Sequence, residues 1–162
     1  MIPLARKIES HIIYMPKTFN LALIHFFDKN FTLCSEYADS AVAELLMKID
    51  ESPDDERYYA TLGYAYGFKG DRQRAIDNAQ FAVKLKPLKS DAWLGYRREL
   101  DLANIYVLTG EYELAMDKIE YLLTIPGDLS VPLLRIDPFY DKLRDLPRFQ
   151  KILTTEYKTN YL

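Results

Sequence analysis

The stretch LGYAYGFKG (62–70) contains three glycines and raises the question of a phosphate-binding loop. Such a loop points backbone N–H groups at an anion just before a helix begins, and it usually carries a lysine followed by serine or threonine. This segment lacks that run, and no strand pattern precedes it. We therefore expect Gly63 to lie where two helices cross closely and Gly70 to end a helix. Gly67 either opens space on a helix face or has no particular role.

A second group of reactive residue types lies in the C-terminal tail. Asp137, Asp141 and Asp145 are interspersed there with arginines, and paired carboxylates can act as acid and base in hydrolysis. The structural interpretation is stronger, because Asp137 followed by Pro138 is typical of a helix N-cap with proline in the first turn, and Pro147 marks another helix start. We expect a cap that covers the last helices, and a protein that is not an enzyme.

Metal and nucleophile chemistry finds little support. The two histidines, His11 and His25, are not paired at a metal-ligand spacing. The single cysteine, Cys34, excludes an intrachain disulfide and a cysteine-cluster zinc site. In the repeat described below, His25 takes the place of a tyrosine and Cys34 that of a small alanine. We expect no metal and no cofactor.

The bulk composition is that of a globular chain. Its 162 residues suit one domain, and 28% of them are charged. The net charge of −3 offers no basic field for nucleic acid, and the longest apolar run, 21–27, is far shorter than the roughly 20 residues that span a bilayer. We expect no nucleic acid partner, no membrane insertion by this segment, and a cytoplasmic location. A periplasmic location stays open if the chain belongs to a larger membrane-anchored protein.

An internal repeat organises the chain. A shift of 40 residues places Leu62, Tyr66, Gly70, Ala75 and Asp77 on Leu102, Tyr106, Gly110, Ala115 and Asp117. A weaker copy lies upstream, so the units are 15–55, 56–95 and 96–130, followed by a cap at 131–162, within a single domain of residues 1–162. Apolar and small residues recur at helical spacing on both sides of each turn. We predict two helices per unit and an all-α fold without strands.

Turn and capping residues set the expected helix boundaries. In the middle unit, the segment 53–55 opens the first helix, Asp71 starts the second, and Pro87 ends it. In the third unit, the first helix begins near Ser90 and runs about five turns, and the second covers 112–125.

The middle unit resembles a tetratricopeptide repeat. The matching residues are Tyr59, Leu62, Gly63, Tyr66, Gly70, Ala75, Ala82 and Pro87. Ala79 departs from that pattern, in which a large residue is usual, and the shift of 40 residues exceeds the family's unit of about 34. The tail SVPLLRIDPFYDKLRDLPRFQKIL (130–153) resembles the end of bacterial proteins in which such repeats follow a signalling or TolB-like domain. The resemblance implies a right-handed superhelix with a C-terminal capping helix region, as the repeat part of a larger bacterial signalling or regulatory protein.

In such an architecture the first helix of each unit lines the inner, concave face. The register places there Arg57, Thr61, Tyr64 and Phe68, then Arg97, Asp101, Asn104 and Leu108, and in the first unit Phe19, Leu23 and Phe27. They describe a groove with an apolar end and an end that bears two arginines. We predict a non-catalytic protein–protein interaction scaffold that binds a peptide or partner domain there, with no buried cluster of ionisable groups. Relatives that clamp a C-terminal carboxylate use lysines that are missing here, so that activity is not implied.

Two alternatives stay open. One is a structural spacer or homodimerisation module, which an exposed apolar patch around Phe19, Phe26 and Phe27 would favour. The other, weaker alternative is a hydrolase, which would need the tail carboxylates to face a pocket.

Overall fold

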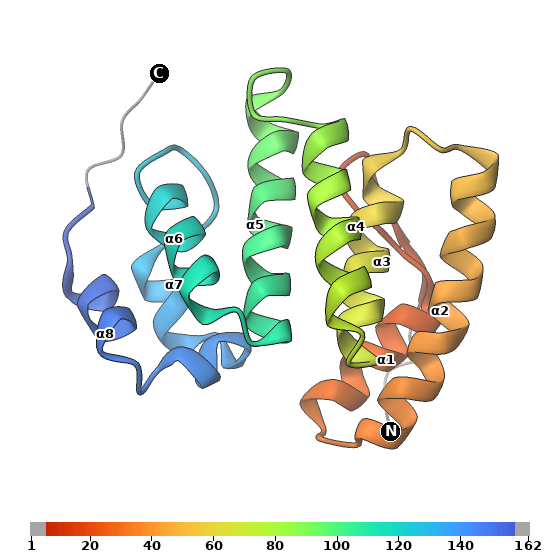
Figure 1. The fold of residues 1–162 in the computed structure, drawn as a ribbon, viewed down its shortest axis with the longest axis horizontal. Coiled ribbons are helices and arrows are strands. Elements are labelled where there is room, and N and C mark those ends of the chain that lie inside the picture. The colour runs from red at the N-terminus through yellow and green to blue at the C-terminus, as the bar shows by residue number, and fades with distance from the viewer. Residues whose placement is uncertain (1–5, 158–162) are drawn as a thin grey trace.

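The computed structural model describes residues 6–157 and shows three consecutive helix pairs in a stack (Figure 1). The pairs are α1 (Lys17–Phe27) with α2 (Phe31–Glu51), α3 (Glu56–Phe68) with α4 (Arg72–Leu85), and α5 (Ala92–Thr109) with α6 (Tyr112–Leu122). Each helix packs against the next along the chain, and α3 also packs against α1 and α5. The predicted all-α class is confirmed. The first two pairs lie within the predicted units 15–55 and 56–95, whereas the third begins at Ala92, four residues before the predicted unit 96–130.

Capping side chains and left-handed residues define the helix ends. Asp55, Asp71 and Asp91 each accept a hydrogen bond from a backbone N–H in the first turn of α3, α4 and α5. Gly70 and Gly110 follow α3 and α5 with φ of 76° and 85°, a conformation that glycine adopts without steric cost. Both glycines therefore act as the helix stops that the sequence predicted.

Two predicted helix boundaries were wrong by a few residues. Asp91 caps α5 in place of Ser90, because the Ser90 hydroxyl donates a hydrogen bond to the Pro87 carbonyl instead. Helix α6 ends at Leu122 and not at residue 125. There the N–H and the hydroxyl of Thr124 both donate to the Tyr121 carbonyl, at 3.0 and 2.7 Å, and this tighter turn closes the helix.

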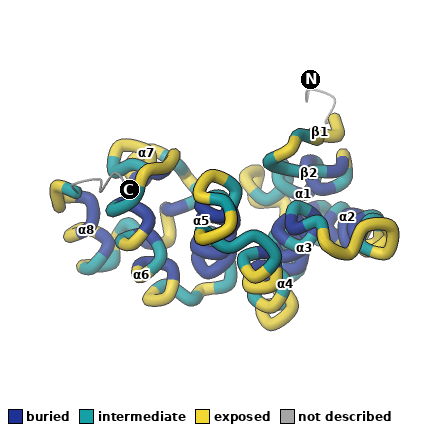
Figure 2. The backbone as a smooth tube through the Cα atoms, turned by 90° about the horizontal axis from the view of Figure 1, so that it is seen from above, coloured by how far each residue is buried: buried dark blue, intermediate teal, exposed yellow. Residues whose placement is uncertain are grey.

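An N-terminal hairpin corrects the prediction that the chain has no strands. Strands β1 (Ile8–Glu9) and β2 (Tyr14–Met15) pair antiparallel, and the Ser10 hydroxyl accepts hydrogen bonds from two N–H groups of the turn. Strands of two residues are too short to show an alternating pattern in a sequence. In the view of Figure 2 the hairpin and α4 lie on opposite sides of α3.

The C-terminal region forms a cap of three short helices, α7 (Val131–Ile136), the 3₁₀ helix η1 (Pro138–Leu143) and α8 (Pro147–Thr154). The Asp137 carboxylate accepts the Phe139 N–H and so caps η1, as predicted. Arg148 at the start of α8 lies 2.6 to 2.8 Å from three carboxylates of α6. These ion pairs, with the buried Phe149, attach the cap to the last repeat helix.

Two glycines of α3 are close-packed. A Cβ on Gly63 would lie 2.7 Å from the Ile105 side chain and 2.9 Å from the Ala75 carbonyl oxygen of α4. This agrees with the predicted helix crossing. A Cβ on Gly67 would lie 2.4 Å from the end of the Leu108 side chain, with no backbone atom in the way. Gly67 therefore makes room for Leu108 of α5, which agrees with the alternative that this glycine opens space on a helix face.

Alanine at the two positions should have different effects. We expect Gly63→Ala to lower the free energy of unfolding by about 1–3 kcal/mol, because the Ala75 carbonyl is backbone and cannot move aside. Gly67→Ala should change it by less than about 1 kcal/mol, because Leu108 can rotate and alanine favours the helix. Urea denaturation measures the free energy of unfolding of both variants. If Gly63→Ala loses as little stability as Gly67→Ala is expected to lose, the α3–α4 crossing does not require glycine.

Candidate functional site

The structure divides the predicted concave residues into two groups. Arg57 and Thr61 lie beneath the hairpin: Arg57 donates to the Ser10 carbonyl, and the Thr61 hydroxyl donates to the Tyr14 carbonyl at 2.6 Å. Thr61 is buried by this contact. These two residues hold the hairpin onto α3 and do not line the hollows described next.

Phe68 and Phe19 belong to the apolar interior. Their ring centroids lie 5.6 Å apart, and Phe26 packs 5.1 Å from Phe68. Phe19 is fully buried, whereas Phe27 is 43% exposed. An exposed apolar patch was expected around Phe19, Phe26 and Phe27. Phe19 is buried and does not contribute to such a patch, whereas Phe27 does.

Seven of the predicted residues of the inner face, Phe19 among them, converge on one hollow of about 200 Å³, here called the central hollow. Its predicted lining residues are Phe19, Leu23, Phe27, Tyr64, Arg97, Asp101 and Asn104, joined by Met15, Asp137 and Phe139. Helices α1, α3 and α5 supply the predicted residues, and the hairpin and η1 region supply the others. The helical register therefore brought together side chains that are up to 85 positions apart, from Phe19 to Asn104.

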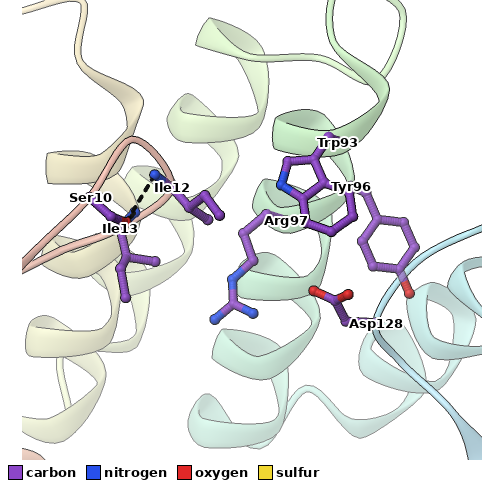
Figure 3. A pocket seen from close by; sticks show the side chains of 7 residues that line it. All are labelled: Ser10, Ile12, Ile13, Trp93, Tyr96, Arg97 and Asp128. Atoms are coloured by element: carbon purple, nitrogen blue, oxygen red, sulfur yellow. Dashed lines mark hydrogen bonds between the residues drawn. The ribbon is translucent and has the colours of Figure 1, made fainter.

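Two further hollows adjoin the central one. The Trp93 cleft, of about 230 Å³, shares Arg97 with it and is lined also by Ser10, Ile12, Ile13, Trp93, Tyr96 and Asp128 (Figure 3). The Phe31 hollow, of about 270 Å³, shares Phe27 and Phe139 and adds Phe26, Lys29, Phe31, Pro138, Asp141 and Lys142. Because neighbouring hollows share lining residues, the three hollows are here called the groove.

A chain of hydrogen bonds crosses the central hollow. The Tyr140 hydroxyl of η1 donates to Asn104 at 2.7 Å, the Asn104 amide donates to the Tyr64 hydroxyl at 3.0 Å, and the Tyr64 hydroxyl donates to Asp101 at 3.3 Å. Burial raises the pKa of both tyrosines and of Asp101, although Arg98 and Arg97 oppose the rise at Asp101. Both hydroxyls therefore stay protonated donors at neutral pH, and the chain ties η1, α5 and α3 together.

Arg98 lies behind this wall with only 1% of its surface exposed. It donates to the Ile12 carbonyl of the hairpin at 2.8 Å, and its charge is met by Asp101 at 3.1 Å and Glu56 at 3.9 Å. The interaction hypothesis predicted no buried cluster of ionisable groups, and that prediction was wrong. No local pattern indicated that Arg98 would be covered by a hairpin formed more than 80 residues earlier in the chain.

The tail carboxylates do not converge. Asp137 lines the central hollow and caps η1, Asp141 lines the Phe31 hollow and pairs with Arg144 at 2.7 Å, and Asp145 is exposed. Cys34 is buried against Ala22 and Ala38, and burial raises the pKa of its thiol. Among residues 6–157, no group of three or more histidine, cysteine or acidic residues is placed to hold a metal ion.

Several residues of the groove and its support escaped the sequence interpretation, among them Trp93, Asp128, Tyr140 and Arg98. Trp93 and Asp128 precede and follow the segments assigned to the concave face, and Tyr140 lies in the tail that was interpreted as a cap alone. The helical register carried no signal for them, because their positions depend on how the hairpin and η1 fold back onto α5.

No family model, curated protein or solved structure matches this chain. Within the described part of the chain, no helix combines the length and the apolar content that a membrane crossing requires.

Replacing Arg98 tests the buried charge cluster. We expect Arg98→Met to lower the free energy of unfolding by about 3–5 kcal/mol at neutral pH, because Asp101 and Glu56 lose their buried counter-charge. Without the arginine, burial raises the pKa of Asp101 further above its unfolded value. The folded variant then binds protons more readily than the unfolded chain, so its stability should rise as the pH falls from 7 toward about 4.

Urea denaturation at several pH values measures this deficit. The double variant Arg98→Met/Asp101→Asn is the matched control, because it removes both charges and should recover part of the loss. A deficit that does not change with pH would show that the lost contacts, and not the buried carboxylates, destabilise the variant.

Proposed function

We propose that this protein is a non-catalytic interaction module that binds an extended protein segment in the groove formed by the three hollows. The observation that carries the proposal is the sharing of lining residues. Arg97 borders the Trp93 cleft and the central hollow, and Phe27 and Phe139 border the central hollow and the Phe31 hollow. Each hollow is smaller than the roughly 300 Å³ of pockets that enclose drug-sized ligands. A row of such hollows suits successive side chains of a peptide.

The tetratricopeptide resemblance supports the same function. On this proposal the three helix pairs form a right-handed superhelix, and α1, α3 and α5 face the bound segment. The chain then serves as the repeat part of a larger bacterial signalling or regulatory protein, in the cytoplasm. The packing of α3 on both α1 and α5 agrees with this arrangement.

Homodimerisation is the second candidate, and one observation favours it. Phe27 and Phe31 are 43% and 63% exposed beside the Phe31 hollow, and exposed aromatic side chains next to one another are common at protein interfaces. Sedimentation of the purified protein over a range of concentrations separates the two candidates. A dimer that dissociates in a Phe31→Ala variant would favour the second.

Peptide selection tests the binding groove. A library of random peptides is selected against the protein, and the selected peptides are synthesised and titrated against variants. We expect Phe27→Ala to weaken their binding roughly tenfold, because an exposed aromatic anchor shared by two hollows is lost. Met47→Ala is the matched control, because Met47 is 61% exposed on α2, outside the groove, and should leave binding unchanged. Selected peptides that bind both variants equally would contradict the groove assignment.

A further inference from the structure

Unsatisfied donors gather at one place in the groove wall. In the described residues, the buried side-chain nitrogen and oxygen atoms without a hydrogen-bond partner are Nε of Arg97 and Nε and Nη1 of Arg98. Buried polar groups in native proteins are nearly always paired with protein, water or ligand. All three atoms are N–H donors of guanidinium groups, so only an acceptor can pair with them. The two Arg98 atoms face the carboxylates of Asp101 at 3.1 Å and Glu56 at 3.9 Å.

Arg97 is the accessible member of this pair. Its side chain is 31% exposed, and it borders both the Trp93 cleft and the central hollow. Asp101 lies 3.7 Å from its Nε, and no hydrogen bond joins its guanidinium to another described residue. In Figure 3 the guanidinium extends into the space between the hairpin and the Asp128 segment. Arg97 is thus placed to meet a ligand that enters the groove.

Neighbouring charges narrow the type of acceptor. Asp101 makes its closer contact with Arg98, at 3.1 Å, and its distance of 3.7 Å from the Arg97 Nε is too long for a hydrogen bond. Asp128 and Asp137 also line the hollows, and neither lies within ion-pair distance of Arg97 among the described residues. Their negative charge disfavours a dianionic phosphate at this position. A single carboxylate fits better, because it can accept two parallel N–H bonds from one guanidinium.

Apolar surfaces lie on both sides of Arg97. Trp93, 57% exposed, stands at the rim of one cleft, and the rings of Phe27 and Phe139 line the hollow on the other side. We propose that the groove recognises an extended segment in which an acidic side chain neighbours a large apolar one. The carboxylate binds Arg97, and the apolar side chain enters the central hollow. This inference rests on the proposed function and specifies the chemistry of the bound segment.

Blocked dipeptides test the inference directly. Trp93 is the only tryptophan of the chain, so its fluorescence reports binding at the cleft. N-acetyl-Glu-Phe-amide is titrated beside N-acetyl-Gln-Phe-amide and N-acetyl-Lys-Phe-amide. We expect the Glu peptide to bind about tenfold more tightly than the Gln peptide, since a hydrogen bond to a charged group is lost with glutamine.

Variants of the protein complete the experiment. Arg97→Gln should abolish the preference for Glu, and Arg97→Glu should transfer it to the Lys peptide. Arg72→Gln is the matched control, because Arg72 is an exposed arginine of α4 outside the groove and should not alter any affinity. Urea denaturation of each variant confirms that it folds. Rescue of binding by Arg97→Lys would separate the charge from the packing of the side chain.

Several results would overturn the inference. They are equal affinities for the Glu and Gln peptides, tighter binding of the Lys peptide to the unmodified protein, and no fluorescence change up to the solubility limit of the peptides. The proposed function fails separately, when the selected library peptides do not depend on Phe27. Library peptides that need Phe27 but ignore Arg97→Gln would leave the groove in place and remove only the acidic anchor.

Discussion

The buried guanidinium of Arg98 is the constraint on which the inner face depends. A charged group in the interior needs nearby acceptors and counter-charges, and three elements bring one each to Arg98. The carbonyl of Ile12 comes from the hairpin, Glu56 from α3, and Asp101 from α5 itself. Because Asp101 also accepts from Tyr64, the same cluster extends through Asn104 to η1. Polar contacts around the charge of Arg98 therefore join the hairpin, α3, α5 and η1.

The fold was predictable where it depended on local sequence. Helical periodicity, the acidic N-caps and the glycine stops are each contained within a few residues, and they located three helix pairs with boundary errors of a few residues. The hairpin was not predictable in this way. Its strands have two residues each, and its position on the stack depends on contacts of Thr61 and Arg98 that span 47 and 86 positions. Such contacts leave no periodic trace in the sequence.

The same distinction applies to the candidate site. The register of the first helices predicted seven residues that line the central hollow, because residues on one face of successive stacked helices must face the same space. The register also placed Arg57 and Thr61 on that face of α3. The hairpin covers these two residues, and the register contained no information about the hairpin. Trp93 and Asp128 were missed because a cleft between non-consecutive elements has no pattern in the sequence. The helical register therefore predicted most residues of the central hollow and missed most residues of the Trp93 cleft and the Phe31 hollow.

The polar chain across the central hollow also bears on what the groove can bind. Tyr64, Asn104 and Tyr140 are held by one another before any ligand arrives, so a bound segment would not need to order them. The hairpin already covers part of the inner face, so a whole helix or domain has less open surface there than a narrow extended chain has. The exposed Trp93 lines the Trp93 cleft, and the exposed Phe27 lines the central hollow and the Phe31 hollow. On the proposed function, a preformed polar network flanked by exposed aromatic side chains suits the recognition of a short segment by a few side chains.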